Sequence, residues 1–414
     1  MKKMVIGLFI AVALPLAVGC GSVTPDSPEE GDNELKTIVL TKGQEAVANT
    51  VAEFGIDLFR DVAIGENGNM MISPFSASLC LSMLAAGAQG ETYSQMAKAL
   101  GFEGLSSEDI GSYYKTIVDG VLSADNSSVI SVADAIWIAK NMTLRKPYVS
   151  EVTAYYNAVV DNLDFNNPQA AAGTINAWAD RNTNGMIKHV VDDLDPATRM
   201  VLANALYFKG KWRGSHEFAL SDRKFTDITG KSDKVKFFGE YGSRQMWGYV
   251  DGVRVLGLPY GNGAFRMVMV LPPAGIDFKQ FISGIKASDW NKWVESLRSC
   301  DVNFQVPVFK SEFTMEDSFK EAMEKRGMKL AFTPYADFGK ISNEDICINF
   351  MIQKTAVDVN EKGTEAAAVT VVGMKTTSVS VPEPPKEFIA DRPFIYAITE
   401  TTSKTLLFIG THVK

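Results

Sequence analysis

The cysteine with the clearest chemical context in this sequence is Cys20. Lys2 and Lys3 precede an apolar run over residues 4–18, which is too short to span a bilayer comfortably and is typical of a secretory signal. The run ends in Ala17-Val18-Gly19-Cys20, which resembles a bacterial lipobox, where cleavage before the cysteine leaves a diacylglyceryl-cysteine. An ordinary signal peptide cut nearby stays open as the alternative. We predict a signal peptide over residues 1–19 and lipidation of Cys20.

Side chains that could carry catalysis of their own are few. The three histidines, His189, His216 and His412, lie in no recognisable nucleophile or zinc motif. Gly261 and Gly263 lie between two apolar strands and not at a strand–turn–helix junction, which excludes a nucleotide-binding fingerprint. We therefore expect no enzyme activity, no cofactor and no metal site.

The other cysteines indicate packing and not cross-linking. Cys80, Cys300 and Cys347 are far apart in apolar contexts, and their number is odd, so we expect buried free thiols. The net charge of −8 disfavours a nucleic-acid partner, which would need a basic footprint.

The chain divides once, near its start. Residues 20–37 hold few apolar side chains and read as a disordered tether after Cys20. Residues 38–414 contain no Pro/Gly/Ser-rich linker, so we predict one α+β domain.

Several helices and strands of this domain are visible in the sequence. Ser73 is a good N-cap before Pro74, and the apolar residues 75–86 predict a buried helix. Thr92 and Gln95 read as the capping box of a second helix ending near Gly101. Further predicted elements are a helix over residues 175–186, a strand over 201–208 with Asn204 inside it, a hairpin over 253–272, a strand over 354–359 and two C-terminal strands over 394–413.

The segment after that 354–359 strand has no single local preference. A turn over residues 360–363 leads into Ala366-Ala367-Ala368, which favour helix, and then into residues 369–372, which favour strand. As a strand, its face from Thr364 through Ala366 and Ala368 is small and uncharged, so it could enter a sheet without burying a charge. A plain edge strand or surface loop is the alternative.

The order of motifs resembles the serpin family over residues 38–414. The matching runs are Ser73-Pro-Phe-Ser76, Thr183-x-Gly185-x-Ile187, Asn204-Ala-Leu-Tyr-Phe-Lys-Gly-Lys-Trp212, Glu361-Lys-Gly-Thr-Glu-Ala-Ala-Ala368, Asp391-Arg-Pro-Phe394 and Phe408-Ile-Gly410. The resemblance implies three β-sheets, eight or nine helices and an exposed reactive-centre loop at about residues 361–384. It also implies a monomeric inhibitor of trypsin-like and elastase-like serine proteases, and of papain-like cysteine proteases.

In this family the reactive-centre loop is presented to the protease as a substrate. A protease cuts it, forms an acyl-enzyme, and is trapped when the cut loop inserts into the main sheet. The resemblance assigns the hinge to Glu361, Gly363, Thr364, Ala366, Ala367 and Ala368. It assigns the shutter, where the sheet opens, to Ser73, Ser76, Asn204 and Gln353, and the breach to Trp212. The usual shutter histidine falls on Gln353, which makes a pH-sensitive shutter doubtful because glutamine does not titrate.

The sequence leaves several candidates for the bond that a protease would cut. Counting from Gly363 at the family's spacing gives Thr377-Ser378, whereas side-chain chemistry favours Lys375-Thr376 for trypsin-like enzymes. For elastase- or chymotrypsin-like enzymes the suitable residues are Met374, Thr377 and Val379. A non-inhibitory serpin acting as a binding protein is the alternative function. The predicted location is the outer membrane, through the lipid anchor, facing the periplasm or the outside.

Overall fold

The computed structural model describes residues 33–214, 217–364 and 384–414. Its large compact unit spans Glu34–Lys414, and the other unit, Met1–Asn33, is described only at Asn33. The predictions for the signal peptide, for Cys20 and for most of the reactive-centre loop lie outside the described residues. Within them, no helix has both the length and the apolar character needed to cross a membrane.

Nine α-helices and one short 3-10 helix lie in the described ranges, within the expected number. They are α1 (Lys42–Gly65), α2 (Pro74–Gly87), α3 (Gly90–Leu100), α4 (Ser107–Leu122), α5 (Lys146–Tyr156), α6 (Pro168–Asn182), α7 (Phe278–Gly284), α8 (Ala287–Ser296), α9 (Asp317–Lys325) and η1 (Leu330–Phe332).

Helix α2 forms as the sequence predicts. Ser73 Oγ accepts the Ser76 N–H at 3.3 Å, Pro74 occupies the first turn, and nearly every residue of the helix is buried.

Two predicted helix boundaries are wrong. Helix α3 begins at Gly90, so Thr92 and Gln95 lie inside it and form no capping box. Their side chains instead bind a distant segment, because Thr92 Oγ1 accepts the Asp337 N–H and Gln95 Oε1 accepts the Leu330 N–H. Helix α6 begins seven residues before its predicted start and ends at Asn182, because Asn167 caps its N-terminus and Pro168 starts its first turn.

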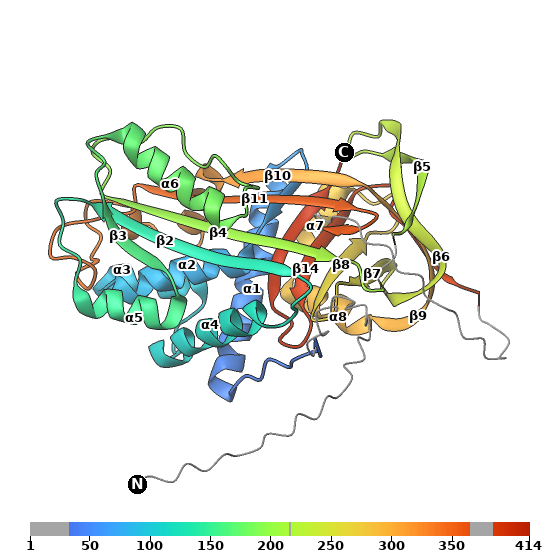
Figure 1. Cartoon of the computed structure of the whole chain (residues 1–414), viewed down its shortest axis with the longest axis horizontal. Helices are drawn as coiled ribbons and strands as arrows, with labels where there is room; N and C mark the ends of the chain where they lie inside the picture. Colours follow the sequence, from blue (N-terminus) through green and yellow to red (C-terminus); the bar gives the residue numbers. More distant parts are fainter. Residues whose placement is uncertain (1–32, 215–216, 365–383) are drawn as a thin grey trace, which may run out of the picture. The chain divides into compact units, whose positions relative to one another are not determined.

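The main sheet has six strands in the order β10-β11-β12-β4-β2-β3 (Figure 1). Their bounds are β10 (Phe309–Met315), β11 (Phe350–Asn360), β12 (Gly363–Thr364), β4 (Met200–Lys211), β2 (Val129–Ala139) and β3 (Val159–Leu163). The sheet is covered on both faces. On β2, Trp137 points to α6 and packs edge-on against Trp178, while alternate residues of the strand face α2 and α4.

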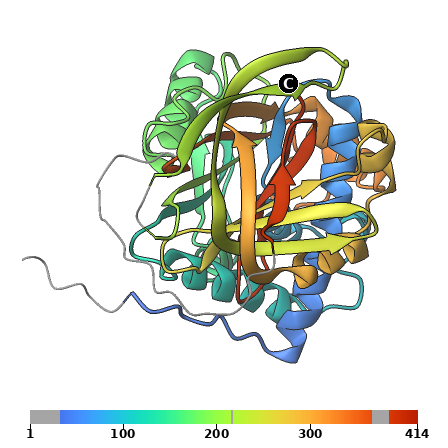
Figure 2. The same ribbon diagram turned by 90° about the vertical axis from the view of Figure 1, so that its right-hand side faces the viewer.

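The other strands form one nine-stranded network, which faces the viewer in Figure 2. They are β1 (Met70–Ile72), β15 (Leu406–His412), β14 (Phe394–Glu400), β8 (Phe265–Leu271), β7 (Val253–Pro259), β6 (Ser232–Val250), β9 (Arg298–Pro307), β13 (Lys386–Ile389) and β5 (Ala219–Thr226). The long strand β6 pairs with β5 in its first half and with β7 in its second. It also pairs with β9 on both sides of a register shift between Glu240 and Ser243. The expected second and third sheets are therefore continuous through β6 and β9.

None of the three cysteines in the described ranges forms a disulfide, as predicted. Cys80 is buried, whereas Cys300 and Cys347 are only half-buried.

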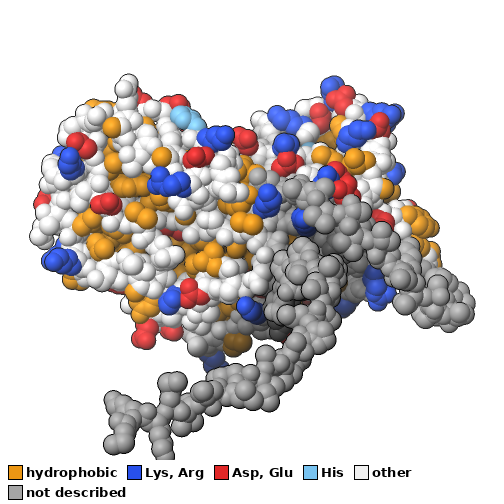
Figure 3. Space-filling view, viewed as in Figure 1, with side chains coloured by type: hydrophobic (Ala, Val, Ile, Leu, Met, Phe, Trp, Pro, Cys, Tyr) orange, Lys and Arg blue, Asp and Glu red, His pale blue; other side chains and the backbone are white. Residues whose placement is uncertain are grey.

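Acidic and basic side chains alternate on the surface of the β5–β6 hairpin (Figure 3). Asp222 pairs with both Lys234 and Lys236, and Lys231 pairs with Asp233, so no single-sign field develops there.

Candidate functional site: an opening in the main sheet

The centre of the main sheet is open at one end. Strands β11 and β4 are parallel and pair directly only where residues 350–353 meet residues 201–204. Further along, the short strand β12 lies between them, antiparallel to both. Thr364 is opposite Val359 of β11 on one side and Gly210 of β4 on the other. Gly363 and Thr364, in the first half of the predicted hinge, thus already occupy the position of a new central strand.

Gly363 fits this position because it has no side chain. Its φ is +147°, and a Cβ atom built on it would lie 2.1 Å from the carbonyl oxygen of Gly210. Any larger residue would have to push β12 away from β4.

The hinge residues before and after Gly363 are also fixed. Thr364 is 1% exposed, and its Oγ1 lies 2.6 Å from the Tyr260 hydroxyl. The Glu361 carbonyl accepts the Phe218 N–H at 3.0 Å, and Lys362 Nζ lies 3.4 Å from Glu217 Oε1. The other hinge residues, Ala366, Ala367 and Ala368, lie outside the described residues, as do the bait residues Met374, Lys375, Thr376, Thr377 and Ser378.

Trp212, the predicted breach residue, lies under the turn that leads into the hinge. Its indole Nε1–H donates to the Asn360 carbonyl at 2.9 Å, and its backbone N–H donates to the Lys362 carbonyl at 3.2 Å. The ring stacks on Tyr260 with centroids 4.6 Å apart. The stacked pair of Trp212 and Tyr260 therefore contacts both the turn at the start of the hinge and the buried Thr364 that follows this turn.

The four predicted shutter residues come together at the closed end of the sheet. Gln353 Oε1 accepts the Ser73 N–H at 2.8 Å, and Gln353 Nε2 donates to the Ser73 carbonyl at 2.9 Å and to Asn204 Oδ1 at 3.1 Å. Asn204 Nδ2 donates to Ser76 Oγ, and Ser73 Oγ donates to the Leu407 carbonyl at 2.7 Å. We call Ser73, Ser76, Asn204 and Gln353 the shutter cluster.

Sequence reasoning missed a fifth polar residue at this place. Asp134 lies directly opposite Asn204 in the β2–β4 pairing, and its Oδ1 accepts the Asn204 Nδ2–H at 2.6 Å. It was visible as a single acidic residue within the apolar run over residues 132–139. Burial raises the pKa of Asp134 to about 7, although the hydrogen bond from Asn204 lowers it in part.

The sequence comparison decides the family. A family profile described as "Serpin (serine protease inhibitor)" matches residues 49–414, which is most of the chain. The chain belongs to the serpin family. Most serpins are protease inhibitors of serine proteases and not enzymes, although some members are non-inhibitory.

Known serpins resemble the chain along most of its length. A serpin-like protein of Thermococcus kodakarensis is 32% identical, with 90% of this chain and 87% of that protein covered. The bovine leukocyte elastase inhibitor is 33% identical, with coverage of 89% and 98%. The native structure of the thermophilic serpin tengpin superposes with a TM-score of 0.82 at 30% identity, covering 92% and 97% of the two chains. The serpin fold expected from the sequence is thereby confirmed.

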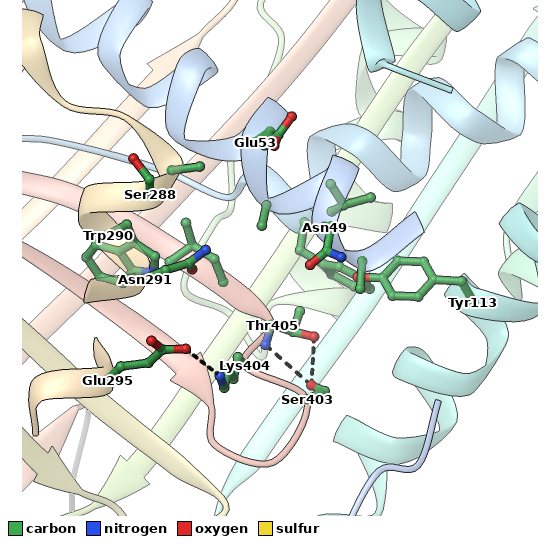
Figure 4. A pocket seen from close by; sticks show the side chains of 16 residues that line it. Asn49, Glu53, Tyr113, Ser288, Trp290, Asn291, Glu295, Ser403, Lys404 and Thr405 are labelled. Carbon is green, nitrogen blue, oxygen red and sulfur yellow. Dashed lines mark hydrogen bonds and ion pairs between the residues drawn. The ribbon is translucent and has the colours of Figure 1, made fainter. Parts of the chain in front are cut away.

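A cavity lined by residues other than those of the hinge is shown in Figure 4. It is a cavity of about 440 Å³ between α1, α8 and the turn joining β14 to β15. Asn49 and Glu53 of α1 and Trp290 of α8 line it, and the Glu295–Lys404 ion pair, 3.1 Å long, lies at its edge. None of the predicted hinge, shutter or breach residues lines it, so it bears only on the alternative function, that of a non-inhibitory binding protein. In the described residues, no group of three or more potential metal ligands occurs.

Proposed function

We propose that this serpin is a suicide substrate of serine proteases, which traps the acyl-enzyme when the cut loop continues β12 between β11 and β4. The observation that carries the proposal is the position of Gly363 and Thr364 between those strands. A loop that has already begun the new strand needs only to extend it.

The register of the sheet supports extension. Gln353 of β11 is opposite Asn204 of β4, which is 149 positions earlier in the chain. Val359 and Gly210, which face Thr364 from either side, are separated by the same number of positions. A strand continuing from Thr364 would therefore pair with both neighbours without either one sliding, and only the direct pairing of residues 350–353 with 201–204 would have to open.

The side chains of the loop also suit insertion. Thr364 faces the buried side of the sheet, and strand alternation would give Ala366 and Ala368 the same face. These residues are small and uncharged, so burying them leaves no unpaired charge.

The test is a matched pair of variants mixed with trypsin and with an elastase. We expect the unaltered protein to form a covalent complex that survives boiling on a denaturing gel. Ala366→Arg should be cut without forming the complex, because residue 366 would face inward in the inserted strand and insertion would bury the new charge. Ala367→Arg, on the outward face, should still form it. Loop cleavage without any complex in the unaltered protein would favour the non-inhibitory, carrier alternative.

The cut bond is proposed from the loop's chemistry. Trypsin-like enzymes would cut Lys375-Thr376, and elastase-like enzymes would cut after Met374 or at Thr377-Ser378. The similarity to the bovine leukocyte elastase inhibitor supports the elastase-like class; papain-like cysteine proteases are a further proposed target class. Sequencing the C-terminal fragment of each complex tests this, because a trypsin fragment that starts anywhere but Thr376 contradicts the Lys375 assignment.

We also propose that the protein is exported, lipidated at Cys20 and anchored to the outer membrane as a monomer. The motif over residues 17–20 supports this location. Radiolabelled palmitate should enter the unaltered protein but not Cys20→Ala, and a labelled Cys20→Ala protein would contradict the assignment.

A further inference from the structure

A buried acid ends a series of hydrogen bonds that crosses the boundary between β11 and β4. Asp134 is 3% exposed and accepts from Asn204, which accepts from Gln353, which accepts from the Ser73 N–H. Every donor in this chain points toward Asp134. This series of hydrogen bonds starts at the N-terminus of α2 and crosses β11 and β4 before it ends on β2.

One link of this chain lies at the boundary that must open. The Gln353–Asn204 bond joins β11 to β4, and these two strands have to part if another strand is to enter between them. When they part, Asn204 loses the donor to its Oδ1. If water then enters beside Asn204, Asp134, which is bonded directly to it, would exchange a buried environment for a wetter one.

Among the described residues, the groups that face Asp134 include no cation. Cys80 of α2 and Tyr114 of α4 interact electrostatically with it, and the carboxylate raises the pKa of both, which burial has already raised. Asn204 on β4 and the nearby Gln353 on β11 do not titrate. A thiol and a phenol are neutral or negative, so the carboxylate is stabilised by hydrogen bonding and by no facing cation.

We propose that ionisation of Asp134 promotes the separation of β11 from β4, so that pH controls how readily the main sheet opens. The inference rests on the proposed function, since it names the regulation of the same opening. Burial raises the pKa of Asp134 in the closed sheet to about 7, and hydration in the open sheet brings it back toward the ordinary value. Opening therefore releases a proton, and it becomes more favourable as pH rises toward 7.

The titrating residue proposed here, Asp134, differs from the shutter histidine that the serpin resemblance implies. Gln353 removes the titrating group from β11, and Asp134 supplies one on β2. A histidine gains charge as pH falls, whereas Asp134 loses it, so the sheet of this chain should be most firmly closed in acid.

Hydrogen exchange of the backbone amides of residues 201–204 and 350–353 tests the proposal without any protease. After correction for intrinsic exchange, the opening equilibrium of the unaltered protein should rise by up to about tenfold per pH unit between pH 5.5 and 7 and level off above. Asp134→Asn keeps the shape and the accepting oxygen but cannot ionise, so its opening should not change over the same range.

Asp161→Asn is the matched control, because it removes an exposed carboxylate from the adjacent strand β3 and should keep the full pH dependence. A pH-independent opening in the unaltered protein would overturn the proposal, even if Asp134→Asn failed to fold. So would an Asp134→Asn variant that kept the pH dependence. If the dependence is found but no covalent complex with a protease forms, the proposed function fails alone.

Discussion

The hydroxyl of Tyr260 lies 2.6 Å from Oγ1 of Thr364, and both groups are buried. Burial raises the pKa of the phenol far above its usual range, so it stays protonated and either oxygen can donate. Since Tyr260 also stacks on Trp212, the end of the described hinge is tied to the breach through one side chain.

Tyr260→Phe should weaken this tie without changing the stacking. The lost hydrogen bond leaves the Thr364 hydroxyl buried and unpaired, which should cost about 1–3 kcal/mol in the free energy of unfolding. Denaturant unfolding measures it. Thr364→Val in the Tyr260→Phe background is the control, because the double variant should lose little more than Tyr260→Phe alone. Additive losses would mean that the two hydroxyls are not coupled.

Gly363→Ala should expel β12 from the sheet. The new methyl group would overlap the Gly210 carbonyl, and the backbone conformation at Gly363 is one that side chains rarely adopt. We expect a loss of about 1–3 kcal/mol, together with faster exchange of the Trp212 amide, which donates to the Lys362 carbonyl next to β12. Gly284→Ala, at the end of α7 with an ordinary backbone and no atom within 4 Å, should lower neither the stability nor the protection of that amide.

Gln353→Leu should destabilise the closed end of the main sheet. It leaves the Ser73 N–H and Asn204 Oδ1 without the partner they have now, and each buried unpaired group costs about 1–3 kcal/mol. Thermal unfolding checks this. Lys354→Gln is the control, because that side chain points to the other face of β11 and binds the His189 carbonyl at 2.7 Å near the surface. Equal stability of the Gln353→Leu and unaltered proteins would show that the cluster does not hold the sheet.

Two buried residues, His412 and Asp134, should make the free energy of unfolding change with pH in opposite directions. Burial lowers the pKa of His412 to about 3, so its contribution is present above its unfolded pKa near 6.5 and is lost as pH falls toward 3. The raised pKa of Asp134 acts the other way, because its contribution is present below about pH 4 and is lost as pH rises through 7. Between pH 4 and 6.5 the two effects oppose each other.

Replacing either residue alone should reveal how the other one makes the Tm depend on pH. In Asp134→Asn the Tm should rise from pH 4.5 to 6.5, whereas in His412→Phe it should fall over that range. Phenylalanine suits the second site because Phe225, Phe309 and Phe394 surround the imidazole. His189→Gln, at an exposed histidine, is the control. Slopes of the same sign in both variants would contradict the assignment.

The sequence predicted the elements whose signals are local. Helix α2 follows from its N-cap and its continuous apolar run, and β4 and the β7–β8 hairpin follow from apolar segments bounded by turns. The predicted capping box at Thr92 and Gln95 failed because those side chains bond to residues more than two hundred positions away. A pattern of four residues does not record such a partner.

The candidate site was predictable only where a motif carried it. The shutter residues were named from the serpin resemblance, and the structure brings all four into contact, although their role in opening remains a prediction. Strand β12 was not predicted, because two residues have no periodicity and their pairing depends on strands that are adjacent only in space. Asp134 was missed because its importance comes from Asn204, which lies opposite it on the next strand.

The path of the last thirty-one residues limits what a protease can release. Strand β14 lies between β8 and β15 inside the nine-stranded network, and nearly all of both C-terminal strands is buried. A cut within residues 365–383 would therefore sever the covalent chain, but the short C-terminal fragment would stay bound to the larger N-terminal fragment through its paired strands. Nicked protein should elute from gel filtration as a single particle and separate into two polypeptides only in denaturant, with the small one acting as a permanent subunit.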